Sequence, residues 1–165
     1  FGPEQQLAEY VRAGEDGPGG RTYVALDDAL ERIEQQLRAL PGPVDALLGF
    51  SQGADLATLL DARAATGCEG ASTPLRCVVL LSGAAPGWAA QAPALFAAPT
   101  PTPALVASDD QVDAVQASDE VARLYASAER ATHGGPGRRP LPADRKECAA
   151  FVEKVRDFIL QHCTA

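Results

Sequence analysis

The residues best suited to covalent chemistry in this sequence are Gly49-Phe50-Ser51-Gln52-Gly53, which match the pattern G-x-S-x-G. A serine in this pattern acts as a nucleophile when it lies on a sharp turn between a strand and a helix. We expect the two glycines to relieve crowding there, so that a bulky residue at either would disturb the turn. The N–H of Gln52 is expected to donate to the oxyanion of an acyl intermediate. Ser51 is therefore the candidate nucleophile, and the alternative is an unreactive serine in a tight turn.

A serine hydroxyl needs a base to take its proton, and the base needs an acid to hold its tautomer. Asp109 and Asp110 directly follow an apolar run that is typical of a strand. Catalytic groups collect at the carboxyl ends of parallel strands, so either carboxylate is a candidate for the acid. The alternative is that the pair belongs to a solvated turn or caps a helix.

Only two histidines are available as the base, His133 and His162. His162 lies near the end of an apolar-periodic segment, where a cation suits the dipole of a helix, so a surface cap is the preferred interpretation. His133 follows a short apolar stretch and opens a glycine-rich loop. It is the candidate base, and the alternative is an ordinary loop histidine.

The spacing of apolar residues predicts the elements that position these groups. Nearly continuous apolar runs predict buried strands over residues 44–50, 77–81 and 104–107. Three- and four-residue spacing predicts helices over residues 26–40, 55–65, 118–128 and 144–162, the last with Asp144 as N-cap. Strands that alternate with helices predict an α/β fold with a parallel sheet flanked by helices.

Residues 84–103 contain five prolines and are expected to form a loop or excursion above the sheet. Specificity for a substrate would lie in such an excursion. Trp88, Leu95 and Phe96 are candidates to line an acyl pocket there, and ordinary packing of the loop is the alternative.

Composition excludes several classes of function. The net charge is −8, and the basic residues are too scattered to follow a nucleic-acid backbone. No apolar stretch approaches the ~20 residues needed to span a bilayer. Cys68, Cys77, Cys148 and Cys163 show no C-x-x-C pairing, which predicts no zinc site and favours reduced thiols in the cytoplasm over a disulfide framework. Neither a metal nor an organic cofactor is expected.

The chain begins at Phe1 and contains no methionine, so we expect that something upstream was removed or left out. Residues 1–22 are rich in glycine, proline and charge, and residues 14–20 among them are typical of a flexible link. We therefore expect residues 1–22 to be a linker or the remnant of a missing amino-terminal part. Residues 23–165 are expected to be the carboxyl-terminal part of an α/β-hydrolase domain.

These motifs resemble the small serine hydrolases of the FSH type, a family that includes fungal thioesterases acting on acyl chains. Residues 42–54, GPVDALLGFSQGA, resemble the family pattern GPFDGILGFSQGA, and residues 79–83, VLLSG, resemble its next strand and Ser-Gly ending. Asp110-Gln111-Val112 resembles the family's D-x-V, which implies that Asp110 rather than Asp109 is the triad acid. Acyl-protein thioesterases and carboxylesterases share G-F-S-Q-G, but the G-P-x-D lead-in favours the first family.

The sequence departs from the family pattern in two places. The family closes with H-x-G-G-H-x-x-P, whose second histidine is the base; here His133 matches the first histidine, Gly137 the second and Pro140 the proline. The family also begins with strands and a His-Gly loop that supplies a second oxyanion donor, and residues 1–22 do not resemble them. Either His133 substitutes as the base, or the base has been lost.

The resemblance implies cleavage of small carboxylic esters or thioesters through an acyl-serine intermediate, with Ser51, Asp110 and His133 as the triad. The alternative is a catalytically inactive α/β-hydrolase-like module that binds an acyl ligand or a protein partner. Close approach of His133 to Ser51 would favour the enzyme.

Overall fold

The computed structural model describes residues 12–13, 22–84, 86–133 and 148–164. Four strands form the main sheet: β3 (Ala46–Phe50), β4 (Cys77–Leu81), β5 (Ala104–Ser108) and β6 (Ala128–Thr132). Within the described residues, four helices accompany it: α1 (Leu26–Arg38), α2 (Gln52–Thr66), α3 (Val112–Ala122) and α4 (Ala149–Cys163). The smaller elements are the 3-10 turns η1 (Gly87–Gln91) and η2 (Pro93–Phe96) and the antiparallel pair β1 (Arg12–Ala13) and β2 (Tyr23–Val24).

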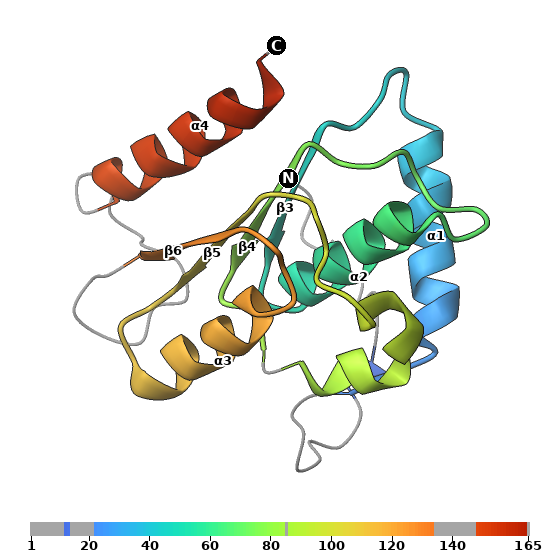
Figure 1. Cartoon of the computed structure of the whole chain (residues 1–165), viewed down its shortest axis with the longest axis horizontal. Helices are drawn as coiled ribbons and strands as arrows, with labels where there is room; N and C mark the ends of the chain where they lie inside the picture. The colour runs from blue at the N-terminus through green and yellow to red at the C-terminus, as the bar shows by residue number, and fades with distance from the viewer. Residues whose placement is uncertain (1–11, 14–21, 85, 134–147, 165) are drawn as a thin grey trace, which may run out of the picture.

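The strands of the main sheet run parallel in the order β3-β4-β5-β6. All four therefore end at the same edge of the sheet, where the residues that follow them are neighbours (Figure 1). This arrangement confirms the expected α/β fold with a parallel sheet flanked by helices.

Both faces of the sheet are covered, which explains why its central strands are continuously apolar. On one face, Val78 and Leu80 of β4 pack in a core with residues of α1, α2 and α3. On the other face, Val79 and Leu81 pack in a second core with Phe158 of α4. Figure 1 shows α4 on the side of the sheet opposite to α1 and α2.

The structure confirms most of the elements predicted from the sequence and corrects one. The three predicted strands correspond to β3, β4 and β5, and the helices predicted at 26–40 and 55–65 correspond to α1 and α2. The helix predicted at 118–128 is wrong in its bounds, because α3 ends at Ala122 and Ala128 already belongs to β6. Tyr125 lies beyond the end of the helix, where its side chain is buried and its backbone pairs with Thr100. A buried apolar residue at this position extends the apolar pattern past the helix.

Several other expectations have partial outcomes. Residues 84–103 form an excursion as predicted, but η1 and η2 lie within it. The predicted link at 14–20 and the predicted N-cap Asp144 lie outside the described residues. The pairing of β1 with β2 was not predicted, because two-residue strands carry no periodic signal.

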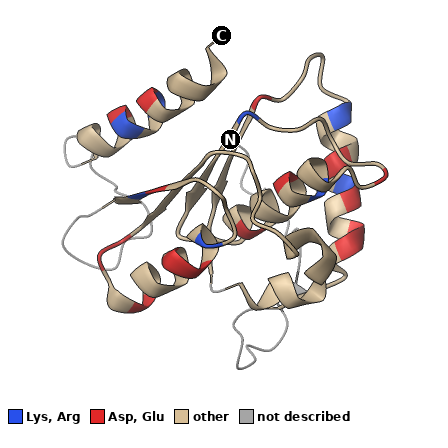
Figure 2. Ribbon diagram, in the orientation of Figure 1, with Lys and Arg blue, Asp and Glu red and all other residues tan. Residues whose placement is uncertain are grey.

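Charged side chains are spread over the helices and connections, with Lys and Arg interspersed among Asp and Glu (Figure 2). The strands β3, β4 and β5 carry none. Within the described ranges, no helix is both long enough and apolar enough to cross a membrane.

One carboxyl group, that of Asp61 in α2, is fully buried away from the strand ends that carry the candidate site. It accepts a hydrogen bond from the Thr102 hydroxyl at 2.8 Å. Burial raises the pKa of Asp61 from 3.8 to about 6, and the hydrogen bond from Thr102 opposes this increase only in part. The folded protein therefore holds a proton on Asp61 more tightly than the unfolded chain does.

The raised pKa of Asp61 predicts a loss of stability as the pH rises. A folded-state pKa above the unfolded value contributes stability that is complete below pH 3.8 and is lost as the pH passes 6, a change of about 3 kcal/mol. Asp61→Asn mimics the protonated acid and keeps an acceptor for Thr102, so it should be the more stable form at pH 8 and lack this pH dependence. Urea unfolding of both proteins at pH 5 and pH 8 measures the difference. Equal pH dependence in the two would contradict the prediction.

Candidate active site

Ser51 lies at a sharp turn between β3 and α2, as the sequence predicted. Its backbone has φ 52° and ψ −121°, a combination that residues with a side chain rarely adopt. The Ser51 N–H donates to the Leu81 carbonyl at 2.8 Å, which continues the pairing of β3 with β4. The chain then turns directly into α2, which begins at Gln52. This strained turn between strand and helix is the geometry of a serine nucleophile.

The two glycines of the motif have different roles. A Cβ atom at Gly49 would lie 2.3 Å from the carbonyl oxygen of Gly53 and 2.6 Å from the Ala54 Cα, so the backbone of α2 leaves no room for a side chain. A Cβ at Gly53 would meet nothing within 4 Å. The expectation of crowding is thus confirmed for Gly49 and wrong for Gly53, because the start of the helix packs against Gly49 and leaves Gly53 facing open space.

Gln52 is the first residue of α2, so its N–H lies beside Ser51 at the positive end of the helix dipole. That position suits the predicted role of the Gln52 N–H in holding an oxyanion.

A buried carboxylate that the sequence analysis did not identify fixes the start of the same helix. Asp55, in the first turn of α2, accepts hydrogen bonds from the Tyr23 hydroxyl at 2.5 Å and from the Ala84 N–H at 3.0 Å. It thereby ties β2 and the segment after β4 to the helix behind Ser51. An acidic residue inside an apolar helix was the only signal in the sequence, and it does not reveal the partners.

A second serine, Ser82, lies beside Ser51 at the end of the neighbouring strand. Phe50 pairs with Leu81 in the parallel register, so Ser51 and Ser82 are the next residues on adjacent strands. Ser82 also has a left-handed backbone, with φ 51°, and its N–H donates to the Ala107 carbonyl at 2.7 Å. In the sequence, Ser82 is recognisable only as part of the Ser-Gly ending of a strand.

His133 follows β6 and is 1% exposed. Its Nε2 lies 2.9 Å from the Ser82 hydroxyl oxygen, within hydrogen-bonding distance, and its N–H donates to the Ser108 carbonyl at 2.9 Å. The ring packs edge-on against Phe151 of α4, with centroids 5.5 Å apart. Over the described part of the chain, the Nδ1 atom has no hydrogen-bond partner. The structure therefore joins the candidate base to Ser82, and no hydrogen bond among the described residues joins it to Ser51.

Asp109 and Asp110 follow β5 at the same edge of the sheet. Asp109 Oδ1 accepts a hydrogen bond from the Gln111 N–H at 3.0 Å, the contact of a turn that leads into α3. The exposed Asp110 accepts from the Gln111 side-chain amide at 3.1 Å. Asp109 thus has a local structural contact to the backbone, whereas the contact of Asp110 among the described residues is to a side chain.

Comparison with known families matches residues 2–147 to the family described as Serine hydrolase (FSH1). The chain belongs to this family. Its strained serine at the end of β3 is the feature of the structure that agrees most directly with that description.

Two relatives of this FSH1 chain are Esterase OVCA2 of Bos taurus and of Homo sapiens. The first is 34% identical over 135 residues, which make up 80% of this chain and 59% of the relative. The second is 33% identical over 135 residues, 81% of this chain and 58% of the relative. The FSH1 chain therefore spans somewhat less than three fifths of the length of these curated relatives.

The remaining candidate residues lie away from Ser51 in this FSH1 chain or outside the described ranges. His162 is in the last turn of α4, and its ring packs edge-on against that of Phe158, with centroids 4.7 Å apart; its role as a helix cap stays a prediction. Gly137 and Pro140 of the closing motif fall among the residues that are not described.

Trp88, Leu95 and Phe96 pack against the core on the α2 side of the sheet. Trp88 is fully buried, and its ring contacts that of Phe96 edge-on with centroids 5.9 Å apart. These contacts are those of ordinary packing, and the predicted acyl pocket stays a prediction.

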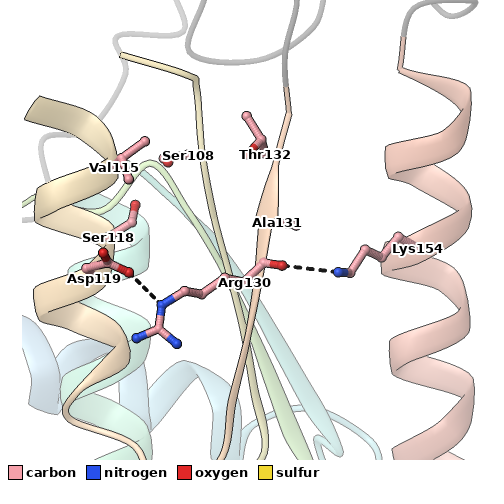
Figure 3. A pocket seen from close by; sticks show the side chains of 8 residues that line it. All are labelled: Ser108, Val115, Ser118, Asp119, Arg130, Ala131, Thr132 and Lys154. Atoms are coloured by element: carbon pink, nitrogen blue, oxygen red, sulfur yellow. Dashed lines mark hydrogen bonds and ion pairs between the residues drawn. The ribbon is translucent and has the colours of Figure 1, made fainter. Parts of the chain in front are cut away.

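A cavity of about 360 Å³ lies beside β6, between α3 and α4 (Figure 3). Arg130 crosses it to pair with Asp119 at 2.5 Å, and Lys154 donates to the Arg130 carbonyl at 3.1 Å. Neither Ser51 nor His133 lines this cavity, so its shape does not define a substrate site at the nucleophile. The lining residues are Ser108, Val115, Ser118, Asp119, Arg130, Ala131, Thr132 and Lys154.

Proposed function

We propose that this FSH1 chain is a serine hydrolase that cleaves small carboxylic esters or thioesters through an acyl-serine intermediate. The main support for the proposal is the strained backbone conformation of Ser51 at the turn between β3 and α2. The printed name of its relatives, esterase, supports the same class of substrate.

In the proposed reaction Ser51 attacks the acyl carbon, and the Gln52 N–H stabilises the oxyanion. His133 accepts the serine proton and returns it to the leaving group, while Asp110 orients the histidine. No metal or organic cofactor takes part. Water then attacks the acyl-serine and releases the acid.

A hydrolysis assay with short p-nitrophenyl esters and matched thioesters tests this function. We expect slow turnover, because Gly137 takes the place of the family's catalytic histidine and no second oxyanion donor is recognisable. Ser51→Ala should reduce the rate to that of buffer. Activity untouched by Ser51→Ala would reject the mechanism.

The second candidate function is a noncatalytic module that binds an acyl ligand or a protein partner. The contact that favours it is the one between His133 and Ser82, since it engages the candidate base with a residue other than Ser51. The test measures binding of a fluorescent fatty acid by the normal chain and by Ser51→Ala. Equal binding by both, together with no hydrolysis by the normal chain, would support this function over the enzyme.

The choice between the two acids gives a separate prediction. Asp110→Asn should lower the hydrolytic rate by ten-fold or more, because it removes the group that is proposed to orient His133. Asp109→Asn should leave the rate within about threefold, because an asparagine oxygen still accepts the Gln111 N–H in the turn. Rates for the two matched variants decide the question, and equal losses would contradict the assignment to Asp110.

We also propose that residues 23–165 form the carboxyl-terminal part of an α/β-hydrolase domain in which a further strand pairs with β3, after a linker or remnant at residues 1–22. Among the described strands of the main sheet, β3 is one of the two edge strands, and its Leu48 is 58% exposed beside an apolar cavity of about 180 Å³. An added strand would satisfy this edge. Slower hydrogen exchange in β3 within a longer native polypeptide, compared with this chain, would support the proposal, and unchanged exchange would contradict it.

A cytoplasmic site of action completes the proposal. The Cys77 and Cys163 sulfur atoms are 3.7 Å apart, yet both cysteines are free. Burial and the neighbouring Cys163 raise the pKa of the Cys77 thiol to about 12, which keeps it protonated and unreactive. Alkylation of the protein after acid quenching of the cells and denaturation should find both thiols reduced, and a Cys77–Cys163 disulfide would contradict a reducing compartment.

A further inference from the structure

Three residues that follow strands lie along the carboxyl edge of the main sheet, whose order is β3-β4-β5-β6. Ser51 follows β3, Ser82 occupies the equivalent position after β4, and His133 follows β6 (Figure 1). Both serines have left-handed backbones, with φ values of 52° and 51°. A left-handed backbone costs free energy for a residue with a side chain, and such strained residues cluster at functional sites. Two of them at neighbouring positions therefore point to a shared role.

Ser82 lies between the nucleophile and the candidate base. The His133 ring is buried, and its Nε2 is within 2.9 Å of the Ser82 oxygen. Ser82 itself is only half-buried and is adjacent to Ser51 in the register of the sheet. Because the His133 ring is buried and contacts the Ser82 hydroxyl, the most direct path for the Ser51 proton to His133 runs through that hydroxyl.

We propose that Ser82 is a proton-relay residue that couples Ser51 to His133, an inference that rests on the proposed function. As the bond between Ser51 Oγ and the acyl carbon forms, the Ser51 proton passes to Ser82 Oγ. The proton of the Ser82 hydroxyl passes at the same time to His133 Nε2. His133 then returns a proton through Ser82 to the leaving group as its bond to the acyl carbon breaks, so the Ser82 hydroxyl and the imidazole end as they began and Ser51 carries the acyl group.

The relay also fixes the tautomer of the resting histidine. Nε2 must be the acceptor for the Ser82 hydroxyl, so the ring proton lies on Nδ1, the atom without a partner in the described residues.

The test is the rate at which a fluorophosphonate modifies Ser51, because this reaction needs the same proton removal and does not depend on repeated turnover. Ser82→Ala should slow modification by about 10²-fold, the size of effect that general-base catalysis supplies. Ser118→Ala, which removes another buried serine hydroxyl, is the matched control and should react at the normal rate. The rate of modification can also be measured in mixtures of light and heavy water. For the normal chain, a plot of this rate against the fraction of heavy water should be curved, because two protons move. For Ser82→Ala the plot should be linear.

The outcomes separate the relay from the proposed function. If Ser51→Ala stays unmodified while Ser82→Ala reacts within about threefold of the normal chain, the relay is wrong and the nucleophile stands. If Ser51→Ala is still modified, the proposed function itself fails. Should Ser82→Ala not fold, His133→Gln serves instead, because it keeps a hydrogen-bonding group near Ser82 and lacks a base. Modification of His133→Gln at the normal rate would overturn the relay.

Discussion

Gly49→Ala is expected to destabilise this protein by about 3 kcal/mol or more. The added methyl group would lie 2.3 Å from the Gly53 oxygen, and both the turn and the helix backbone would have to move to accept it. Because Ser51 lies within that turn, we also expect hydrolysis and fluorophosphonate modification to be lost at temperatures where the variant is still folded. Urea unfolding followed by circular dichroism measures the stability.

Gly53→Ala is the matched control. Its methyl group would meet nothing within 4 Å, and alanine is favoured over glycine inside a helix by up to about 1 kcal/mol. We therefore expect this variant to be as stable as the normal chain or slightly more so. Equal destabilisation by the two substitutions would show that the contact between β3 and the start of α2 is not as described.

His133→Gln is expected to reduce ester hydrolysis by about 10² to 10⁴-fold, because it removes the only candidate base among the described residues near the strand ends. Glutamine retains a hydrogen-bonding group near Ser82 and much of the volume against Phe151. The loss should therefore appear in the rate constant for acylation while the melting temperature changes little. Single-turnover hydrolysis of a p-nitrophenyl ester measures this rate constant.

His162→Gln is the control for the histidine prediction. His162 lies in the last turn of α4 and contacts Phe158, on the face of the sheet that faces away from α2. Its replacement should leave hydrolysis unchanged. If His133→Gln hydrolyses the ester as fast as His162→Gln does, then the base lies elsewhere in the chain or none is used.

The strands could be predicted from the sequence because both faces of the sheet are covered. Burial on both faces makes β4 a continuous apolar run, a pattern that no exposed segment imitates. The bounds of α3 could not be predicted in the same way. Val112 at its start is 78% exposed, whereas Tyr125 beyond its end is buried, so the apolar pattern is displaced toward the carboxyl end relative to the helix.

The candidate site was predictable only in part. Features set by neighbouring residues could be predicted, whereas contacts between residues far apart in the sequence could not. Ser51 is specified by five adjacent residues and by the strand and helix on either side of it. The contact between Ser82 and His133 joins residues 51 positions apart. It depends on the order of the strands and on the small residues at the end of β5, neither of which a local pattern encodes.

The most direct test of Ser51 as the nucleophile is to locate the modified residue by mass spectrometry after reaction with a fluorophosphonate. Trypsin cleaves after Arg38, Arg63, Arg76 and Arg123, so Ser51 falls in peptide 39–63 and Ser82 in peptide 77–123. We predict a single adduct, on Ser51 in the first of these peptides. An adduct on Ser82, or a reaction that modifies neither peptide, would contradict the assignment of the nucleophile.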